Sequence, residues 1–454
     1  MGTSETSPQP VSVKLATAPL GLSEVVRRAR QNVLEIIPEL TTRQPMVSGK
    51  MWKRWHMVMD PDGLRRILQE KPLSYPKSPI TKNVLRPGIG NSLFIAEGSH
   101  WRWQRRAAAP VFAMRNIRLL SPVMSAAADR VSERLEENLG DSIDVYAEMV
   151  QATFEVISDV TFSGGQAFDR TMIHRAIDDY LAGTAQVSAF DVLGLPAWVP
   201  RLGRLISGKA TRDMKRVATD AIAERRTRSS ASNADLFDLL CAGQDPDTGR
   251  RMNDAELRDN LLTFIVAGHE TTALTLAWSL YLLSISPRWQ EKVRAEANST
   301  LGRRCATASD LGSLDVTRQV IEESLRLYPP AALLLREAQE PDTIGGREVR
   351  KGDTMFLPIY ALHRNRCLWE DPNQFDPGRF ADRRKINRFA YLPFGGGPRV
   401  CIGAGFAMQE ATIVLATLVS RFRFSLAEGR QPKPVLVLTL RPQGGVWLDI
   451  SPAQ

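Results

Sequence analysis

The spacing of apolar residues along the chain predicts a protein built mainly from helices. From about Leu22 to Pro330, apolar residues recur every three or four positions, which gathers them on one face of a helix. The longest such pattern begins at Asp254, and Asn253 before it is a suitable N-cap. The expected helices are about Pro61–Gln69, Trp101–Phe112, Pro122–Asn138, Val145–Phe162, Arg170–Gly183, Arg212–Arg226, Asp254–Ser286, Pro287–Leu301 and Val316–Leu327.

Two parts of the chain depart from this helical spacing. Apolar residues alternate around Trp52, Trp55 and Met57, as in a half-buried hairpin, and beyond Pro330 the apolar segments become short. The elements expected in these parts are a hairpin within Gln44–Met59, strands at Ile344–Val349 and Thr354–Leu357, a glycine-rich loop at Phe394–Gly403, a last helix ending near Phe422, and a closing hairpin of Val435–Leu440 with Val446–Ile450.

The organisation of the chain is that of one domain. It contains no internal repeat and no interdomain linker, so residues 21–454 are expected to form a single domain, mainly α with a minor β region. Residues 1–20 are polar with scattered proline, and this composition predicts a flexible N-terminal segment.

Composition and net charge indicate which kinds of macromolecule the protein is expected to bind. The 454 residues carry a net charge of +9, with 43% hydrophobic and 24% charged residues, as in an ordinary globular protein. The positive excess is spread along the chain and accompanies no nucleic-acid-binding motif. It therefore favours an acidic protein partner or peripheral contact with an anionic membrane over nucleic acid.

The sequence predicts a cytoplasmic, monomeric protein without a membrane span. The first residues, MGTSETSPQPVSVK, lack the features of a secretory signal. The longest run without charge, Thr271–Pro287, is short for a span and is interpreted as a buried helix. Four separated cysteines without a C-x-x-C pair argue against a disulfide framework or a zinc site and favour a reducing compartment; they are Cys241, Cys305, Cys367 and Cys401.

The glycine-rich loop carries the most distinctive of these cysteines. Three glycines after Phe394 allow the backbone to turn tightly and to approach a flat ligand closely. Cys401 lies just before a predicted helix, whose N-terminal partial charge favours a thiolate, and Arg399 can pair with a carboxylate. The alternative is a structural cysteine in a turn. A phosphate-binding loop is excluded, because the motif G-x-x-x-x-G-K-[ST] is absent from this segment.

This loop resembles the haem-binding signature F-G-x-G-x-R-x-C-x-G of the cytochrome P450 superfamily. The fixed positions are filled by Phe394, Gly395, Gly397, Arg399, Cys401 and Gly403. The resemblance implies haem b with Cys401 as the axial ligand of iron, and with Phe394, Gly395 and Arg399 as further haem contacts. It also implies the family's fold, a triangular prism of helices with a long central helix over the haem. A thiolate ligand favours cleavage of the O–O bond.

The longest predicted helix carries the sequence Ala-Gly-His-Glu-Thr-Thr at residues 267–272. Polar groups inside an apolar helix need partners, so a satisfied polar cluster is one interpretation. Ala273 excludes an H-E-x-x-H zinc site. The segment resembles the family's [AG]-G-x-[DE]-T-[TS] stretch. That resemblance implies a proton relay of Glu270 and Thr271 beside dioxygen, with Ala267 and Gly268 as a flat wall over the haem.

Two further segments resemble the scaffold of the same family. Glu323 and Arg326 share a helical face, and as a surface pair they would contribute only about 0–1 kcal/mol. Their helix, followed by Tyr-Pro-Pro, resembles the E-x-x-R helix, and residues 375–380 resemble the F-x-P-x-R-F segment. The resemblance implies a buried network of Glu323, Arg326 and Arg379 that supports the cysteine loop.

Further haem contacts follow from the same resemblance. Trp101 and Arg105 share a helical face and resemble the family's W-x-x-x-R, which implies that they bind the propionates with help from His100. An amphipathic basic helix is the alternative for this segment. Arg336 resembles the strand arginine that also meets a propionate, whereas His363 is expected to be structural.

Electrons are expected from a separate acidic ferredoxin-type protein with its NAD(P)H-dependent reductase, because no flavin or ferredoxin domain is recognisable in the chain. Basic residues near the motifs predict a docking surface for such a protein. These residues are Arg102, Arg106, Arg115, Arg118, Arg383, Arg384, Lys385 and Arg388.

The substrate is indicated only by class. By analogy with the family, the pocket segments Ile80–Phe94, Val266–Thr271 and Ala331–Leu334 are mostly aliphatic, which suits hydroxylation of a fatty acid, terpenoid or steroid-like molecule by O₂. The candidate pocket residues are Val84, Phe94, Val266, Ala267, Ala332 and Leu333. Ala189–Ile206 is expected to form an access lid or to touch a membrane. A haem electron carrier or gas sensor, and a haem-thiolate isomerase or dehydratase, remain as alternatives.

Overall fold

The computed structural model describes residues 9–50, 53–161, 208–227 and 235–453, and the single positions 175, 177 and 179. Most of the expected helix Arg170–Gly183 and all of the segment Ala189–Ile206 lie outside the described residues. Within these ranges no helix is both long enough and apolar enough to span a bilayer.

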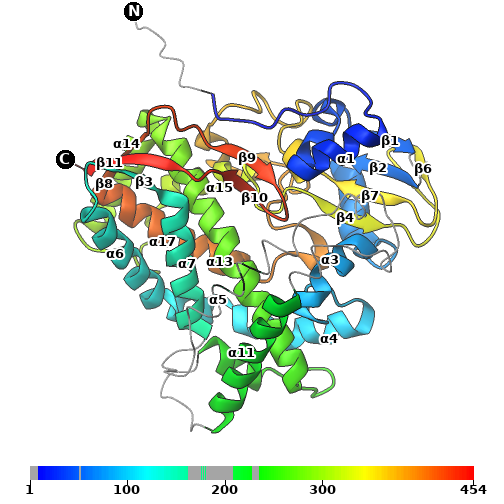
Figure 1. Ribbon diagram of the computed structural model, residues 1–454, viewed down its shortest axis with the longest axis horizontal. Coiled ribbons are helices and arrows are strands. Elements are labelled where there is room, and N and C mark those ends of the chain that lie inside the picture. Colours follow the sequence, from blue (N-terminus) through cyan, green and yellow to red (C-terminus); the bar gives the residue numbers. More distant parts are fainter. Residues whose placement is uncertain are drawn as a thin grey trace, which may run out of the picture.

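Helix α13 (Asp254–Ser284) runs through the middle of the molecule, and the other helices pack around it (Figure 1). It begins with a capping box, in which Asn253 and Glu256 each accept a hydrogen bond from the other's backbone N–H. Its helical neighbours are α7 (Val145–Thr161), α11 (Gly208–Thr227), α15 (Asp315–Leu327) and α17 (Ala404–Arg421). Because it is covered on nearly all sides, most of its residues are buried, polar ones included.

The helices predicted from apolar spacing in the described ranges are confirmed to within a few residues. Besides those named above, they are α1 (Leu22–Gln31), α2 (Pro61–Arg65) with its continuation Arg66–Glu70, α4 (Gly98–Ala108) with a 3-10 turn at Ala109–Phe112, α6 (Ser121–Glu136) and α14 (Pro287–Leu301). Further 3-10 turns occupy Val33–Ile36, Glu39–Thr42, Leu311–Ser313, Pro377–Phe380, Arg383–Lys385 and Gly397–Arg399.

Within the described residues, four helices were not predicted. They are α3 (Pro79–Ile89), α5 (Met114–Leu119), α12 (Leu236–Ala242) and α16 (Ile359–Leu362). Helix α3 contains Pro87, and proline normally ends a helix because it lacks the N–H and its ring clashes with the preceding turn. The other three are too short to show a periodic pattern.

A β region lies beside α1 at one side of the molecule (Figure 1). The hairpin predicted within Gln44–Met59 is confirmed, and its second strand continues into a four-stranded sheet of order β1-β2-β7-β4. Only the pairing of β2 with β7 is parallel in this sheet. Its strands are β1 (Met46–Lys50), β2 (Arg54–Val58), β4 (Leu334–Glu337) and β7 (Thr354–Leu357). The predicted strand Ile344–Val349 is a hairpin of β5 (Asp342–Ile344) with β6 (Arg347–Val349).

The predicted closing hairpin at the C-terminus is wrong in its pairing. Strand β9 (Lys433–Leu436) pairs with β10 (Leu440–Gln443), so both strands of the hairpin come before residue 444. The chain then turns at Gly444 and Gly445, both with positive φ. It continues as β11 (Trp447–Pro452), which pairs with β8 (Phe422–Leu426) and β3 (Ser142–Asp144) in a different sheet. Apolar spacing alone could not distinguish these pairings.

The N-terminal segment is held against the domain from Val11 onward. The Val11 N–H donates to the Tyr281 hydroxyl at 3.1 Å, and the Tyr328 hydroxyl donates to the Val11 carbonyl at 2.7 Å. The Val13 N–H donates to the Tyr360 hydroxyl at 2.9 Å. The polar composition of residues 1–20 predicted a flexible segment, and these contacts to buried tyrosines differ from that prediction.

Candidate functional site

The loop that carries Cys401 is shaped by glycine and closed by a backbone hydrogen bond. Gly397 has φ 67°, and a Cβ atom there would lie 1.9 Å from the Leu68 carbonyl oxygen, so a larger residue does not fit. The Cys401 N–H donates to the Phe394 carbonyl at 2.9 Å. The loop thereby presents Cys401, which is exposed, just before α17.

The Cys401 sulfur is accessible, yet protein surrounds much of it. This desolvation raises the pKa of the thiol, against the N–H groups of Gly403 and Ala404 and the charge of Arg105, which lower it. A thiolate here therefore needs further positive charge, and a coordinated metal ion supplies such charge.

Basic side chains gather near Cys401 around the carboxylate of Glu97. Lys77 and Arg336 face each other in an antiparallel bridge, and Arg399 forms an ion pair with Glu97. Burial and the neighbouring Arg399 lower the pKa of Arg336 to about 10. Burial, Arg336 and Arg399 hold the pKa of Lys77 well below its usual value. This uncompensated positive charge suits a ligand with more than one carboxylate.

The residues predicted to bind propionates are only partly brought into this cluster. The Arg399 guanidinium carbon lies 4.1 Å from the centroid of the Trp101 ring. Arg105 lies close enough to Cys401 for their charges to interact. His100 instead contacts its own helix, through Gln104 at 2.7 Å and Trp103 at 3.3 Å, so these contacts do not support the expected help to a propionate.

Apolar contacts join α4, α13 and the cysteine loop. The rings of Phe112 and Phe264 meet edge to face with centroids 5.0 Å apart. Phe112 also lies 3.9 Å from the position that a Cβ atom of Gly403 would occupy. Ile402 and Trp101 pack against the same apolar cluster. The three predicted segments therefore come together in space.

One stretch of α13 is open, although the helix is otherwise largely buried. Val266, Gly268 and Thr271 are half-buried there, and Ala267 is exposed. The Thr271 hydroxyl donates to the Ala267 carbonyl at 2.7 Å, so its oxygen retains the capacity to accept a hydrogen bond. Small residues and one hydroxyl thus line the open face, and a flat ligand can approach them closely.

Glu270 points away from this open face. Its carboxylate accepts a hydrogen bond from the Thr439 hydroxyl at 3.0 Å and forms an ion pair with Arg441. The sequence predicted a relay of Glu270 and Thr271, and the structure places these neighbouring side chains in different surroundings. A side-chain movement of Glu270, or intervening water, is required for them to exchange a proton.

The candidate pocket residues divide into exposed and buried sets. Phe94 is 41% exposed, Leu333 is half-buried, and Val266 and Ala267 lie on the open stretch of α13. Ala332 is fully buried in the main core, so its predicted place in the pocket lining is wrong. Val84 is also buried, within a small cluster that includes Leu438 at its edge.

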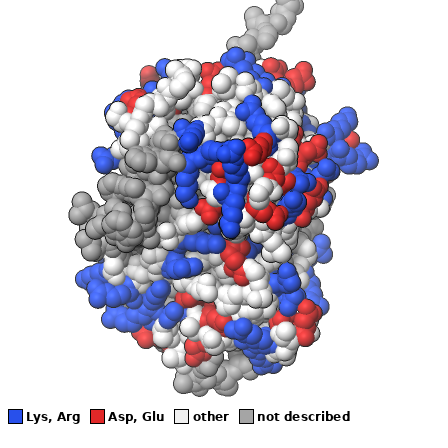
Figure 2. Space-filling view, turned by 90° about the vertical axis from the view of Figure 1, so that its right-hand side faces the viewer, with Lys and Arg blue, Asp and Glu red and all other residues white. Residues whose placement is uncertain are grey.

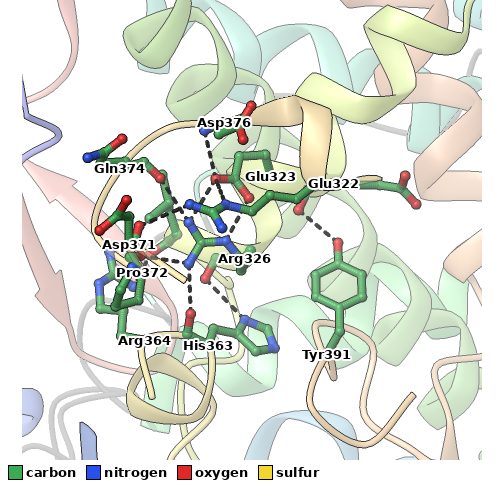
Figure 3. A network of polar contacts seen from close by, with 12 residues as sticks. Glu322, Glu323, Arg326, His363, Arg364, Asp371, Pro372, Gln374, Asp376 and Tyr391 are labelled. Carbon is green, nitrogen blue, oxygen red and sulfur yellow. Dashed lines mark hydrogen bonds and ion pairs between the residues drawn. The ribbon is translucent and has the colours of Figure 1, made fainter. Parts of the chain in front are cut away.

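The scaffold network predicted from the E-x-x-R helix is formed. Arg326 donates to both carboxylate oxygens of Glu323, at 2.6 and 2.7 Å, and both side chains are completely buried (Figure 3). Arg326 also donates to the carbonyls of His363, Pro372 and Gln374 at 2.7 to 3.0 Å. Arg379 lies 3.6 Å from Glu323 and completes the predicted set. Because Arg326 makes these further hydrogen bonds within the protein, the buried Glu323–Arg326 pair is expected to contribute differently to stability from an isolated surface pair.

Two contacts join this network to the residues that immediately precede the cysteine loop. The His363 ring lies 3.1 Å from the Arg326 carbonyl, and its other nitrogen accepts from the Leu392 N–H at 2.9 Å. Burial and the charge of Arg326 lower the pKa of His363 to about 3, so the ring is neutral at physiological pH. The Tyr391 hydroxyl donates to the Glu322 carbonyl at 2.8 Å (Figure 3). The structural role expected for His363 is consistent with these contacts.

The basic residues proposed as a docking surface are partly neutralised. Arg383 pairs with Glu322, Arg384 pairs with Asp382 at 2.8 Å, and Arg106 pairs with Asp245 at 2.6 Å. On the face at the right of Figure 1, Lys and Arg also gather in groups with Asp and Glu between them (Figure 2). On this face the positive charge is therefore interrupted by acidic residues and does not form one uniform patch.

Glu410, on α17, is a buried acid that no sequence pattern indicated. It is 1% exposed, and one of its carboxyl oxygens has no hydrogen-bond partner among the described residues. Burial raises the pKa of Glu410 well above its usual value, and a hydrogen bond from Thr272 opposes this only in part. Burial therefore favours the protonated, neutral form of this acid in the folded protein.

This burial predicts a pH-dependent stability. A raised pKa means that the folded state binds the proton more tightly, so Glu410 costs stability increasingly as pH rises above its unfolded-state pKa. Glu410→Gln removes that cost. We therefore expect the melting temperature of the variant to exceed that of the wild type, and we expect this difference to be larger at about pH 8 than at about pH 5. Glu428→Gln, at an exposed position, is the control. Equal dependence of the melting temperature on pH in Glu410→Gln and wild type would contradict the raised pKa of Glu410.

Several residues at the site were missed because their positions carry no local pattern. Lys77 stands between two prolines, and Thr439 and Arg441 lie in the C-terminal hairpin, about which the sequence predicted only strand spacing. Only the fold brings these residues to Arg336 and Glu270.

Comparisons with known proteins agree in sequence and in fold. The family model "Cytochrome P450" matches residues 25–448. Cytokinin hydroxylase of Arabidopsis thaliana is 33% identical over 431 residues, which cover 92% of this chain and 77% of that protein. Cyclooctat-9-en-7-ol 5-monooxygenase of Streptomyces melanosporofaciens is 33% identical over 406 residues, which cover 87% and 86%. The crystal structure of the cytochrome P450DA heme domain has a TM-score of 0.80 and 26% identity, covering 90% of each chain.

Proposed function

The chain belongs to the cytochrome P450 family, and on that premise we propose that it binds haem b through Cys401 and hydroxylates a hydrophobic small molecule. It is a cytochrome P450 monooxygenase, which uses a haem-thiolate cofactor, O₂, a substrate and a redox partner. The fold is that of the family, mainly helical with a minor β region.

One observation carries the proposal for this chain's own residues. The exposed Cys401 lies close enough to Lys77 and Arg105 for their charges to interact. Arg336 and Arg399 lie beside Lys77, where the carboxylate of Glu97 interacts with them. A soft ligand beside a group of partly buried basic side chains fits a metal-bearing group that carries two propionates. The open stretch of α13, with Ala267 and Gly268, allows a flat ring to approach.

The roles of the residues follow from their chemistry. A thiolate-ligated haem, when bound, supplies the activation of O₂ for oxygen insertion. Lys77, Arg105, Arg336 and Arg399 would hold this group through its carboxylates. The Thr271 hydroxyl donates or accepts a proton at the open face, and Glu270 takes up protons from the solvent side, where its carboxylate pairs with Arg441. Glu323, Arg326 and Arg379 hold the cysteine loop in place.

The substrate and the electron donor are proposed by class. Exposed or half-buried apolar residues such as Phe94, Val266 and Leu333 suit a hydrophobic molecule, for which a fatty acid, terpenoid or steroid-like compound qualifies. The similarity to a cytokinin hydroxylase and a cyclooctat-9-en-7-ol monooxygenase favours hydroxylation over isomerisation or electron carriage. We propose that an acidic ferredoxin-type protein delivers the electrons. We also propose that the enzyme is monomeric and acts in the cytoplasm.

The test is the carbon monoxide difference spectrum of the reduced protein. Wild type is expected to show the red-shifted Soret band of a thiolate ligand, and Cys401→Ser is expected to lose it. Cys367→Ser is the matched control, because Cys367 is also exposed but lies outside the loop. A wild-type spectrum without the red shift would refute Cys401 as the ligand. A product that contains no added ¹⁸O after turnover under ¹⁸O₂ would refute the insertion of oxygen from O₂.

A further inference from the structure

The β9–β10 hairpin brings two polar residues to the acid on α13. The Thr439 hydroxyl donates to Glu270 Oε1 at 3.0 Å, and Arg441 Nε lies 3.2 Å from that hydroxyl oxygen while it also pairs with Glu270 Oε1. One carboxylate oxygen of Glu270 therefore contacts a hydroxyl from the turn of this hairpin and a guanidinium from β10, about 170 residues away in sequence.

The hairpin is anchored well enough to fix this contact. The Trp278 indole N–H donates to the Leu440 carbonyl at 3.1 Å, and the Leu440 N–H donates to the Pro330 carbonyl at 3.0 Å. Leu438 packs against two apolar clusters, one of which contains Val84 from α3 and the other Ile265 from α13. These contacts hold the turn on both sides, and they keep the backbone of Arg441 in place beside Glu270.

The two side chains of the Glu270–Arg441 ion pair differ in their exposure to solvent. The Glu270 side chain is only 5% exposed, whereas the Arg441 side chain is 28% exposed. Thr271, the next residue, instead lies on the open face of the helix with its hydroxyl bonded to the Ala267 carbonyl. Glu270 therefore stands between a partly exposed partner, Arg441, and a neighbour on the open face, Thr271, while its other partner, Thr439, is buried.

We propose that Arg441, with Thr439, is a positioning residue that holds the Glu270 carboxylate at the solvent end of the proton path. This rests on the proposed role of Glu270 as the proton-delivering acid. A proton from solvent binds Glu270 Oε1, which weakens the ion pair, and the neutral acid then turns to pass the proton towards Thr271. Arg441 keeps its own proton throughout and restores the ionised acid to its outer position.

The experiment compares Arg441→Gln, Arg441→Lys and Glu270→Gln with the wild-type holoenzyme. O₂ consumption is measured in H₂O and D₂O, with dodecanoic acid as the hydrophobic probe and a surrogate ferredoxin with its NADPH-dependent reductase. Arg441→Gln is expected to slow O₂ consumption by about tenfold and to enlarge the solvent isotope effect, because proton delivery becomes slower. Arg441→Lys retains a cation and is expected to recover most of the rate. Arg430→Gln, at an exposed arginine before the same hairpin, is the control.

A readout without turnover supports the same comparison. In a double-mutant cycle of thermal unfolding, the loss caused by Arg441→Gln is expected to shrink when Glu270 is already Gln. An unchanged rate and isotope effect in Arg441→Gln, alongside a slowed Glu270→Gln, would overturn the positioning role and leave the proposed function standing. A wild-type rate in Glu270→Gln would overturn the acid's role in the proposed function, and the role of Arg441 with it.

Discussion

Replacing Arg326 with alanine is expected to yield a protein that does not retain haem. The change leaves the Glu323 carboxylate buried without its bidentate partner and removes the donors to three loop carbonyls. Breaking a buried pair from one side typically costs about 3–5 kcal/mol, against a total stability of about 5–15 kcal/mol. The free energy of unfolding in urea and the haem content of purified protein measure the effect.

A surface arginine on the same helix provides the control for this prediction. Arg318 pairs with Asp315 at 2.7 Å and its side chain is 35% exposed, so Arg318→Ala is expected to cost at most about 1 kcal/mol. Arg326→Lys keeps the charge but cannot reproduce the fork of donors, and it is expected to lose stability almost as severely. Equal stability and haem content in the Arg326 and Arg318 alanine variants would contradict a supporting role for the network.

Much of the fold could be predicted because its helices are long and their apolar residues keep a regular spacing. Helix α13 is the clearest case, since its cap at Asn253 and its start at Asp254 both agree with the sequence. Helix α3 was missed because it contains Pro87. The C-terminal pairing was wrong because β9, β10 and β11 have similar apolar spacing, and only the turn at Gly444 and Gly445 separates their partners.

The candidate site shows the same division between local and distant information. Cys401, Gly397 and Arg399 occur in one loop, so a motif was sufficient to identify them. Lys77 and Arg441 reach the site only through the bridge to Arg336 and through the β9–β10 hairpin. Sequence spacing places residues on a face of their own element, but it does not show which distant side chain will meet them.

The other large effect is expected at Thr271. In Thr271→Ala the open face of α13 loses its hydroxyl, while the helix keeps its backbone bonds, because the hydroxyl only bonds back to the Ala267 carbonyl. We expect product formation to fall by roughly a hundredfold, since positioned proton transfer typically contributes about 10²–10⁴-fold. O₂ consumption is expected to continue and to be diverted into hydrogen peroxide. Product and peroxide per NADPH, measured with a substrate found by a spin-shift screen, quantify this change.

The control for Thr271 lies one turn further along the same helix. Thr275 makes the same kind of bond, donating to the Thr271 carbonyl at 2.8 Å, but it is buried and away from the open face. Thr275→Ala therefore removes a matched hydroxyl and is expected to change stability without diverting O₂ to peroxide. Thr271→Ser, which retains a hydroxyl, is expected to keep most of the product yield. If Thr271→Ala and Thr275→Ala gave the same ratio of product to peroxide, the open-face hydroxyl would not direct the proton.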